Sequence, residues 1–151
     1  MRIIVVFVLI IGFFACEESS SAMQNPTFKS IKYGTSFGEC LGYCNTEVEL
    51  SSSAISVKIR STAGDERSNT ASISEDTYNE IVGGIDWENF TRLEDVIGCP
   101  DCADGGAEWL QLETSDTSKK VTFEYQSDIK GISSALSILR SLAEEHRPSE
   151  D

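Results

Sequence analysis

The chain has 151 residues, 40% of them hydrophobic, and a formal net charge of −13 at pH 7. This length is enough for one modest domain with its own hydrophobic core. The acidic balance and the lack of a basic stripe in the sequence all but exclude nucleic-acid binding, because contacts to phosphates need clustered Lys and Arg side chains.

The first predicted element is an N-terminal signal segment. A single arginine precedes an unbroken apolar run, which is too short to span a bilayer comfortably and has the layout of a secretory signal peptide. The run ends at Ala15-Cys16, which resembles the lipobox of bacterial lipoproteins, and Phe13 and Phe14 make it similar to the relaxed lipoboxes of Bacteroidota. We predict a signal peptide over residues 1–15 and lipidation, including palmitate, on Cys16. The alternatives are an ordinary signal peptide cleaved elsewhere and an uncleaved anchor.

A polar, serine-rich spacer follows over residues 16–27, and its composition predicts a flexible linker. Glu17 and Glu18 resemble the acidic signal that sends such lipoproteins to the cell surface, although a solvated linker that stays in the periplasm explains them equally well. Acyl chains on Cys16 would attach the chain to the membrane permanently. The mature chain would then carry 11 basic and 25 acidic side chains, a net charge of −14. We expect a lipid-anchored protein of the cell envelope, at the outer membrane, facing the periplasm or the surface.

A single domain is predicted over residues 28–146. Alternation of apolar and polar side chains indicates half-buried strands at residues 30–35, 46–50, 54–61, 108–114 and 120–126. The polar segment 68–73 can add a short return strand. In the second hairpin we expect five side chains to point inward: Leu110, Leu112, Val121, Phe123 and Tyr125.

Two helices are predicted. Ser74 followed by two acidic residues has the pattern of a helix N-cap, and Gly83-Gly84 ends this first helix early. The last helix is the clearest element, because apolar side chains recur at helical spacing at Ile132, Ala135, Leu136, Leu139, Leu142 and Ala143. Its opposite face carries serine, arginine and glutamate. Residues 147–151 are expected to form a disordered tail.

These elements predict an α+β two-layer domain, an antiparallel sheet of about five strands with two helices packed on one face. Trp87 and Phe90 are expected to fold back over the sheet.

Trp109 is an exception to the alternation of apolar and polar side chains, because it falls on the same face as Gln111 and Glu113, the polar face. We expect the cysteine-rich loops to cover it, with exposure to a partner as the alternative. Trp109, Tyr43 and Asp104 are our candidates for partner binding.

Four cysteines of the domain form two close pairs, Cys40 with Cys44 and Cys99 with Cys102. In an exported chain an even number of cysteines favours structural disulfides, whose connectivity the sequence alone does not rank. A four-thiolate zinc site is the first alternative. Thiol redox chemistry is the weakest, because acidic residues and a strand follow the second pair where a lowered thiol pKa would need a helix N-terminus or cations.

Two motifs, "GECLGYC" and "CPDCADGGAEWLQLE", together with the final amphipathic helix, resemble a group of uncharacterised lipoproteins of Bacteroidota with a C-x-G-x-C motif. The similarity covers most of the chain beyond residue 30. The resemblance implies local bridges, Cys40 to Cys44 and Cys99 to Cys102. It implies no activity, because that group has none established.

Other chemistry finds little support. The only histidine, His146, lies at the end of the last helix, where nothing would hold it as a catalytic base. Asp101, Asp104 and Glu108 could hold calcium, but their spacing matches no EF-hand loop. Paired carboxylates of a glycosidase would need a cleft that a small two-layer domain rarely builds. We therefore expect no enzyme, no cofactor and no metal.

The sequence favours a non-enzymatic, lipid-anchored extracytoplasmic module that binds a protein or envelope partner. One alternative is a metal-binding or thiol-redox lipoprotein that uses the four domain cysteines. A second is a secreted, protease-inhibitor-like module that uses the "CLGYC" loop as a wedge, because constrained loops lose less entropy on binding.

Overall fold

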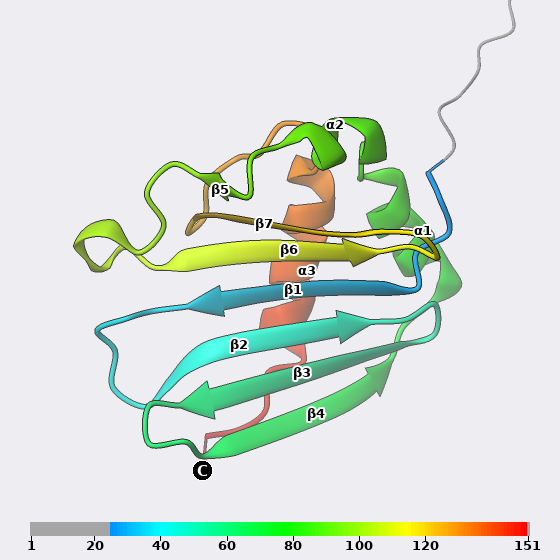
Figure 1. Ribbon diagram of the computed structural model, residues 1–151. Helices are drawn as coiled ribbons and strands as arrows, with labels where there is room; N and C mark the ends of the chain where they lie inside the picture. Colours follow the sequence, from blue (N-terminus) through cyan, green and yellow to red (C-terminus); the bar gives the residue numbers. More distant parts are fainter. Residues whose placement is uncertain (1–24, 151) are drawn as a thin grey trace, which may run out of the picture.

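The computed structural model describes residues 25–150, which form one sheet and three helices (Figure 1). The predicted signal peptide, Cys16 and the first part of the spacer lie outside the described residues. The strands are β1 (Ser30–Ser36), β2 (Tyr43–Leu50), β3 (Ala54–Ser61), β4 (Glu66–Ser72), β5 (Val96–Ile97), β6 (Ala107–Glu113) and β7 (Ser118–Glu124). The helices are α1 (Glu75–Gly83), α2 (Trp87–Arg92) and α3 (Ser133–Glu145).

The strands lie in the order β4-β3-β2-β1-β6-β7-β5. All neighbouring pairs are antiparallel except β5 and β7, which are parallel. The predicted α+β class is confirmed. The predicted count of about five antiparallel strands and two helices is corrected to a seven-stranded mixed sheet and three helices.

Three elements lack strong sequence patterns. Strand β4 forms where segment 68–73 was expected to add a short return strand, but it is an edge strand, so nearly all of its side chains are polar and exposed or half-buried. Strand β5 has two residues and helix α2 has six, which is too short for a periodic signal. Helix α2 contains Trp87 and Phe90, and it begins at an N-cap, Asp86, whose side chain accepts a hydrogen bond from the Asn89 amide at 3.0 Å.

The hydrophobic core lies between one face of the sheet and the helices. The predicted stripe of α3 is buried in full, including Leu136 and Leu139. It packs with inward side chains from the central strands, among them Val48, Val57, Leu110, Leu112, Val121 and Phe123. The other sheet face carries most of the charged and polar side chains of β1, β2, β3, β6 and β7, and Glu108 of β6 is an exception that lies on the core side.

One expectation at the end of a strand is corrected: Tyr125, expected to point inward, follows β7 and is 37% exposed. In the segment expected to form a tail, Arg147 lies against β2, because its guanidinium donates to Thr46 Oγ1 at 3.0 Å and to the Tyr43 carbonyl at 3.4 Å. A hydrogen bond from Asn69 Nδ2 to the carbonyl of His146 at 3.0 Å attaches the end of α3 to β4.

Across residues 25–150, no helix is both long and apolar enough to cross a membrane.

Candidate partner-binding site

Both cysteine pairs lie at one end of the sheet, with Cys40, Cys99 and Cys102 between strands and Cys44 at the start of β2. Residues 37–42 connect β1 to β2, and residues 98–106 connect β5 to β6. We call these two segments together the cysteine loops. Strand β1 runs from the first described residues toward this end, so its seven residues separate Phe28 from the cysteine loops by about 20 Å. In Figure 1 the described chain begins at the right of the sheet and the cysteine loops lie at its left.

Each cysteine loop is closed by a local disulfide. Cys40 is bonded to Cys44 with their Cα atoms 5.8 Å apart, and Cys99 is bonded to Cys102 with theirs 5.5 Å apart. This is the pairing that the resemblance implied. Zinc binding and redox catalysis both need a free thiolate. In the disulfide form none of the four sulfurs is one.

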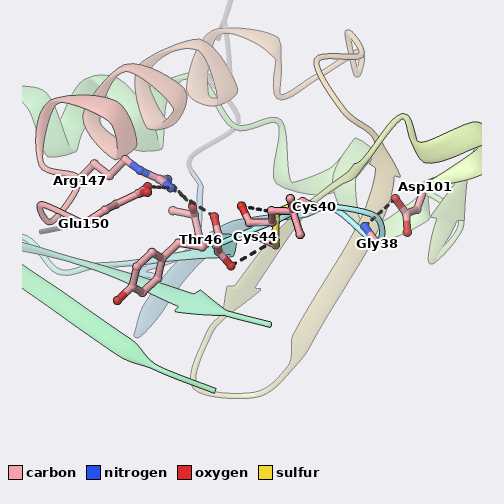
Figure 2. The surroundings of a disulfide bond; sticks show 10 residues. Gly38, Cys40, Cys44, Thr46, Asp101, Arg147 and Glu150 are labelled. Carbon is pink, nitrogen blue, oxygen red and sulfur yellow. Dashed lines mark hydrogen bonds and ion pairs between the residues drawn. A yellow bond between two sulfur atoms is a disulfide. The ribbon is translucent and has the colours of Figure 1, made fainter. Parts of the chain in front are cut away.

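A hydrogen bond joins the two cysteine loops. The Gly38 amide donates to Asp101 Oδ1 at 3.3 Å, across 63 positions of the sequence, and Figure 2 shows these two residues facing each other beside the Cys40–Cys44 disulfide. A β-carbon on Gly38 would lie 2.6 Å from Asp101 Oδ2, so a side chain there would have to displace the Asp101 carboxylate. The two loops therefore form one surface.

Aromatic packing fixes the base of this surface. The ring of Phe37 contacts that of Tyr125 edge to face, with centroids 4.9 Å apart. Gly106 has a positive φ of 80°, and a β-carbon there would lie 2.3 Å from the Phe37 ring. The Gly106 carbonyl accepts hydrogen bonds from the amides of Asp101 at 3.1 Å and Tyr125 at 3.3 Å. The second cysteine loop is thus attached both to the first loop and to the end of β7.

The cysteine loops present one large, fully exposed aliphatic side chain together with several carboxylates. Leu41 lies between the bonded cysteines and is fully exposed. Glu39, Asp101 and Asp104 are exposed as well. The two loops contain no Lys or Arg, and within residues 25–150 none of these three carboxylates belongs to an ion pair. This surface is therefore strongly acidic around a single leucine.

A buried ion pair supports the sheet just below the cysteine loops. The Glu108 side chain is completely buried on the helix-covered face, where Arg140 of α3 donates from Nε to Oε1 at 3.0 Å and also contacts Oε2. Tyr33 of β1 donates its hydroxyl to Oε1 at 2.8 Å. Burial is the larger cause that raises the pKa of Tyr33, and the Glu108 charge adds to it. The hydrogen bond that Arg140 itself makes to Glu108 raises the pKa of Arg140. The Arg140 guanidinium and the Tyr33 hydroxyl give Glu108 the hydrogen-bond partners that a buried carboxylate requires.

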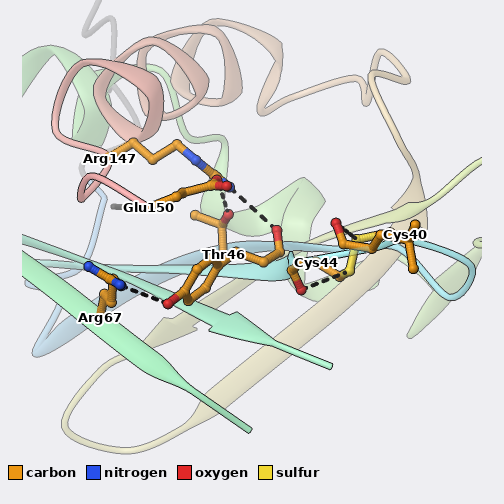
Figure 3. A network of polar contacts seen from close by, with 9 residues as sticks. Cys40, Cys44, Thr46, Arg67, Arg147 and Glu150 are labelled. Atoms are coloured by element: carbon orange, nitrogen blue, oxygen red, sulfur yellow. Dashed lines mark hydrogen bonds and ion pairs between the residues drawn. A yellow bond between two sulfur atoms is a disulfide. The ribbon is translucent and has the colours of Figure 1, made fainter. Parts of the chain in front are cut away.

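A cavity of about 180 Å³ adjoins this ion pair, between the sheet and the end of α3. Its walls include Tyr43, Cys44 and Arg147. Tyr43 is held in turn by Arg67, whose Nε donates to the phenolic oxygen at 2.7 Å. Figure 3 shows Arg67 on one side of this network and Arg147 with Glu150 on the other. Most polar groups here are paired with one another, so we interpret this network as structural support for the end of the sheet that carries the cysteine loops.

The three partner-binding candidates do not meet at one site. Trp109 lies on the open sheet face, where its indole packs on Gly34 and Lys120 Nζ lies 4.1 Å from the ring centroid. Gly34 of the sheet and Lys120 therefore cover Trp109. The expectation that the cysteine loops cover it is corrected. Tyr43 is half-buried at the cavity below α3. Of the three, Asp104 alone lies on the exposed surface of the cysteine loops.

The calcium alternative fails on geometry. Asp101 and Asp104 are exposed in the loop, whereas Glu108 is buried and bound by Arg140. In the described part of the chain, no three His, Cys, Asp or Glu side chains come together as a metal site would need.

Sequence analysis also missed the ion pair between Glu108 and Arg140. The parity that Glu108 shares with Leu110 and Leu112 was an available signal, because it places a carboxylate on the buried face.

No family model matches this chain, and no curated protein matches it either.

Proposed function

We propose that this protein is a lipid-anchored, extracytoplasmic module without enzymatic activity that binds a protein partner through the cysteine loops. The observation that carries the proposal is the joining of two disulfide-closed loops into one exposed surface at a single end of the sheet. Local cross-links reduce the conformational entropy that a loop loses on binding. A surface of this construction is suited to recognition of another protein.

The predicted anchor agrees with the position of this surface. A tether on Cys16 would reach the domain next to Asn25 and Phe28, and β1 carries the chain from there to the cysteine loops. The loops would then point away from the membrane that holds the tether. Their acidic side chains favour the same orientation, because anionic head groups would repel them.

The anchor is tested by growing the host with an alkyne-labelled palmitate and probing the full chain for label. We expect label on the natural chain and on Ser19→Ala, a control within the spacer, and none on Cys16→Ala. The membrane fraction should lose the Cys16→Ala chain to the soluble fraction. Equal labelling of all three chains would contradict lipidation at Cys16.

Partner binding is tested by photo-crosslinking in the host, with a photoreactive side chain at one position at a time. We expect an adduct from Glu39 and Asp104 in the cysteine loops and none from Asp116, an exposed turn residue at the opposite end of the sheet. An adduct only from Lys58 would move the binding site to the open sheet face. No adduct from any of these positions would contradict a partner-binding function.

The protease-inhibitor alternative has one observation in its favour, the full exposure of Leu41 on a disulfide-closed loop. An inhibitor of that kind would slow the hydrolysis of substrates by proteases that prefer leucine, and Leu41→Asp would abolish the effect. Unchanged hydrolysis across a panel of such proteases would leave this alternative without support.

A further inference from the structure

The exposure of Leu41 differs from that of an ordinary surface leucine. Single exposed apolar residues are common on proteins and by themselves indicate nothing. Leu41, however, lies between Cys40 and Cys44, and the next residue, Gly42, has a positive φ of 91°. A disulfide and a glycine conformation therefore hold the leucine outward, at the tip of a loop that cannot easily fold it back.

The surroundings of Leu41 define the chemistry that it can meet. Glu39 lies in the same loop, and the Gly38 hydrogen bond joins this loop to the second one, which carries Asp101 and Asp104. No basic residue occurs in either loop to neutralise these three carboxylates. An apolar pocket would shelter the leucine, and a rim of Lys or Arg would complement the carboxylates of the two loops, whereas an acidic rim would weaken binding because like charges repel.

We propose that Leu41 is the anchor of the interface and that it inserts into an apolar pocket of a protein partner whose rim is basic. This inference rests on the proposed function, because it specifies the partner of the same surface. The cross-linked loop preorganises the anchor, and buried aliphatic or aromatic anchors in well-packed pockets carry most of the energy of many interfaces. The acidic side chains of the cysteine loops speed association with a basic partner and select against acidic partners.

The test uses the partner identified by crosslinking, purified, and the full chain purified from its host in detergent. Dissociation constants are measured for the natural chain and for Leu41→Asp. We expect Leu41→Asp to weaken binding about 30-fold or more, as substitution of a central anchor does, and Leu41→Met to retain most of the affinity. Val96→Asp, which places the same charge on another exposed aliphatic residue, is the matched control and should bind normally.

The proposed attraction between the carboxylates of the cysteine loops and a basic rim on the partner is tested separately. Glu39→Gln and Asp104→Asn each remove one charge, and asparagine tolerates the positive φ of 61° at position 104. We expect both variants to associate more slowly at low salt and to depend less on salt than the natural chain. Asp116→Asn removes one charge at the other end of the sheet and should leave the salt dependence unchanged.

The outcomes separate this inference from the proposed function. If a partner binds but Leu41→Asp binds as tightly as the natural chain, Leu41 is not the anchor and the proposed function stands. If binding tightens when the carboxylates are removed, the basic rim is wrong. If no partner crosslinks to any surface of the chain, both proposals fall.

Discussion

Arg140 of α3 and Glu108 of β6 form an ion pair across the two layers, and the Glu108 side chain has no exposed surface. Arg140 also donates to the Ser127 carbonyl at 2.9 Å, which attaches the segment after β7 to the same helix. One guanidinium thus connects α3, β6 and the loop that follows β7. The cysteine loops are built on the ends of these strands, so the ion pair supports the proposed binding surface from below.

Replacing Arg140 should destabilise the fold strongly. In Arg140→Met the Glu108 carboxylate stays buried without its cation, and breaking such a pair costs about 3 kcal/mol or more. We place the effect near that lower figure because Arg140 is partly exposed and water can reach the site. Urea unfolding of the full chain measures the loss. Replacing both charges, as in Glu108→Leu with Arg140→Met, should restore most of it, because no unpaired charge then remains.

Lys119 offers the matched control for that experiment. It forms an ion pair with the exposed carboxylate of Asp95, and exposed pairs contribute about 0–1 kcal/mol. Asp95→Asn should therefore change the free energy of unfolding little. An Arg140→Met chain as stable as the natural one would show that Glu108 does not depend on its partner.

Tyr33 should make the protein sensitive to alkali. Burial and the neighbouring Glu108 charge raise the pKa of Tyr33 above its ordinary value of 10.0, so the folded state keeps the phenol protonated while the unfolded state ionises. This contribution to stability is complete below pH 10 and declines as the pH rises above it. The free energy of unfolding measured from pH 8 to about pH 11 should fall less in Tyr33→Phe than in the natural chain.

Tyr78 provides the comparison for this titration. Its pKa is also raised by burial, but it has no buried carboxylate beside it, so Tyr78→Phe should change the alkaline slope less than Tyr33→Phe. At neutral pH, Tyr33→Phe should cost about 2 kcal/mol, because the lost hydrogen bond goes to a charged carboxylate. Parallel loss of stability in all three chains above pH 10 would disprove the role of Tyr33.

Gly34 should tolerate no side chain while Trp109 is present. A β-carbon at Gly34 would lie 2.4 Å from Cζ2 of Trp109 and 2.7 Å from the Thr46 carbonyl oxygen. Such overpacking costs about 1–3 kcal/mol, so Gly34→Ala should lower the free energy of unfolding by that amount. The penalty should shrink in the Trp109→Ala background, because one of the two obstacles is then gone. Gly83→Ala is the control, since a β-carbon there meets nothing within 4 Å.

The sequence predicted the elements whose periodicity is strong and failed where a contact joins distant positions. The stripe of α3 and the alternation in β2, β3 and β6 identified most of the core, because burial alone determines those patterns. The link from Gly38 to Asp101 spans 63 positions and that from Arg147 to Thr46 spans 101. Neither has a local signal, because each depends on how the strands are ordered in the sheet.

Arg140 illustrates the same limit on one helix. We placed the arginine of α3 on the polar face, yet it lies four residues after Leu136 and three before Ala143, both of them buried. It therefore borders the apolar stripe, and a long side chain at such a border can reach inward. Only the parity of Glu108 on the facing strand could have indicated where its guanidinium would go.

The local disulfides give the last prediction, which also decides between structural cross-links and the metal alternative. All four domain cysteines should resist alkylation until a reductant is added, and peptide mapping of the unreduced chain should recover Cys40 with Cys44 and Cys99 with Cys102. Each bridge closes a loop of only four or five residues, so the entropy of loop closure limits its stabilisation to about 2 kcal/mol. Cys99→Ser with Cys102→Ser should therefore fold and remain stable enough to assay. Zinc that copurifies with alkylatable thiols, or a bridge between the two pairs, would overturn this pairing and favour a metal-binding or differently connected protein.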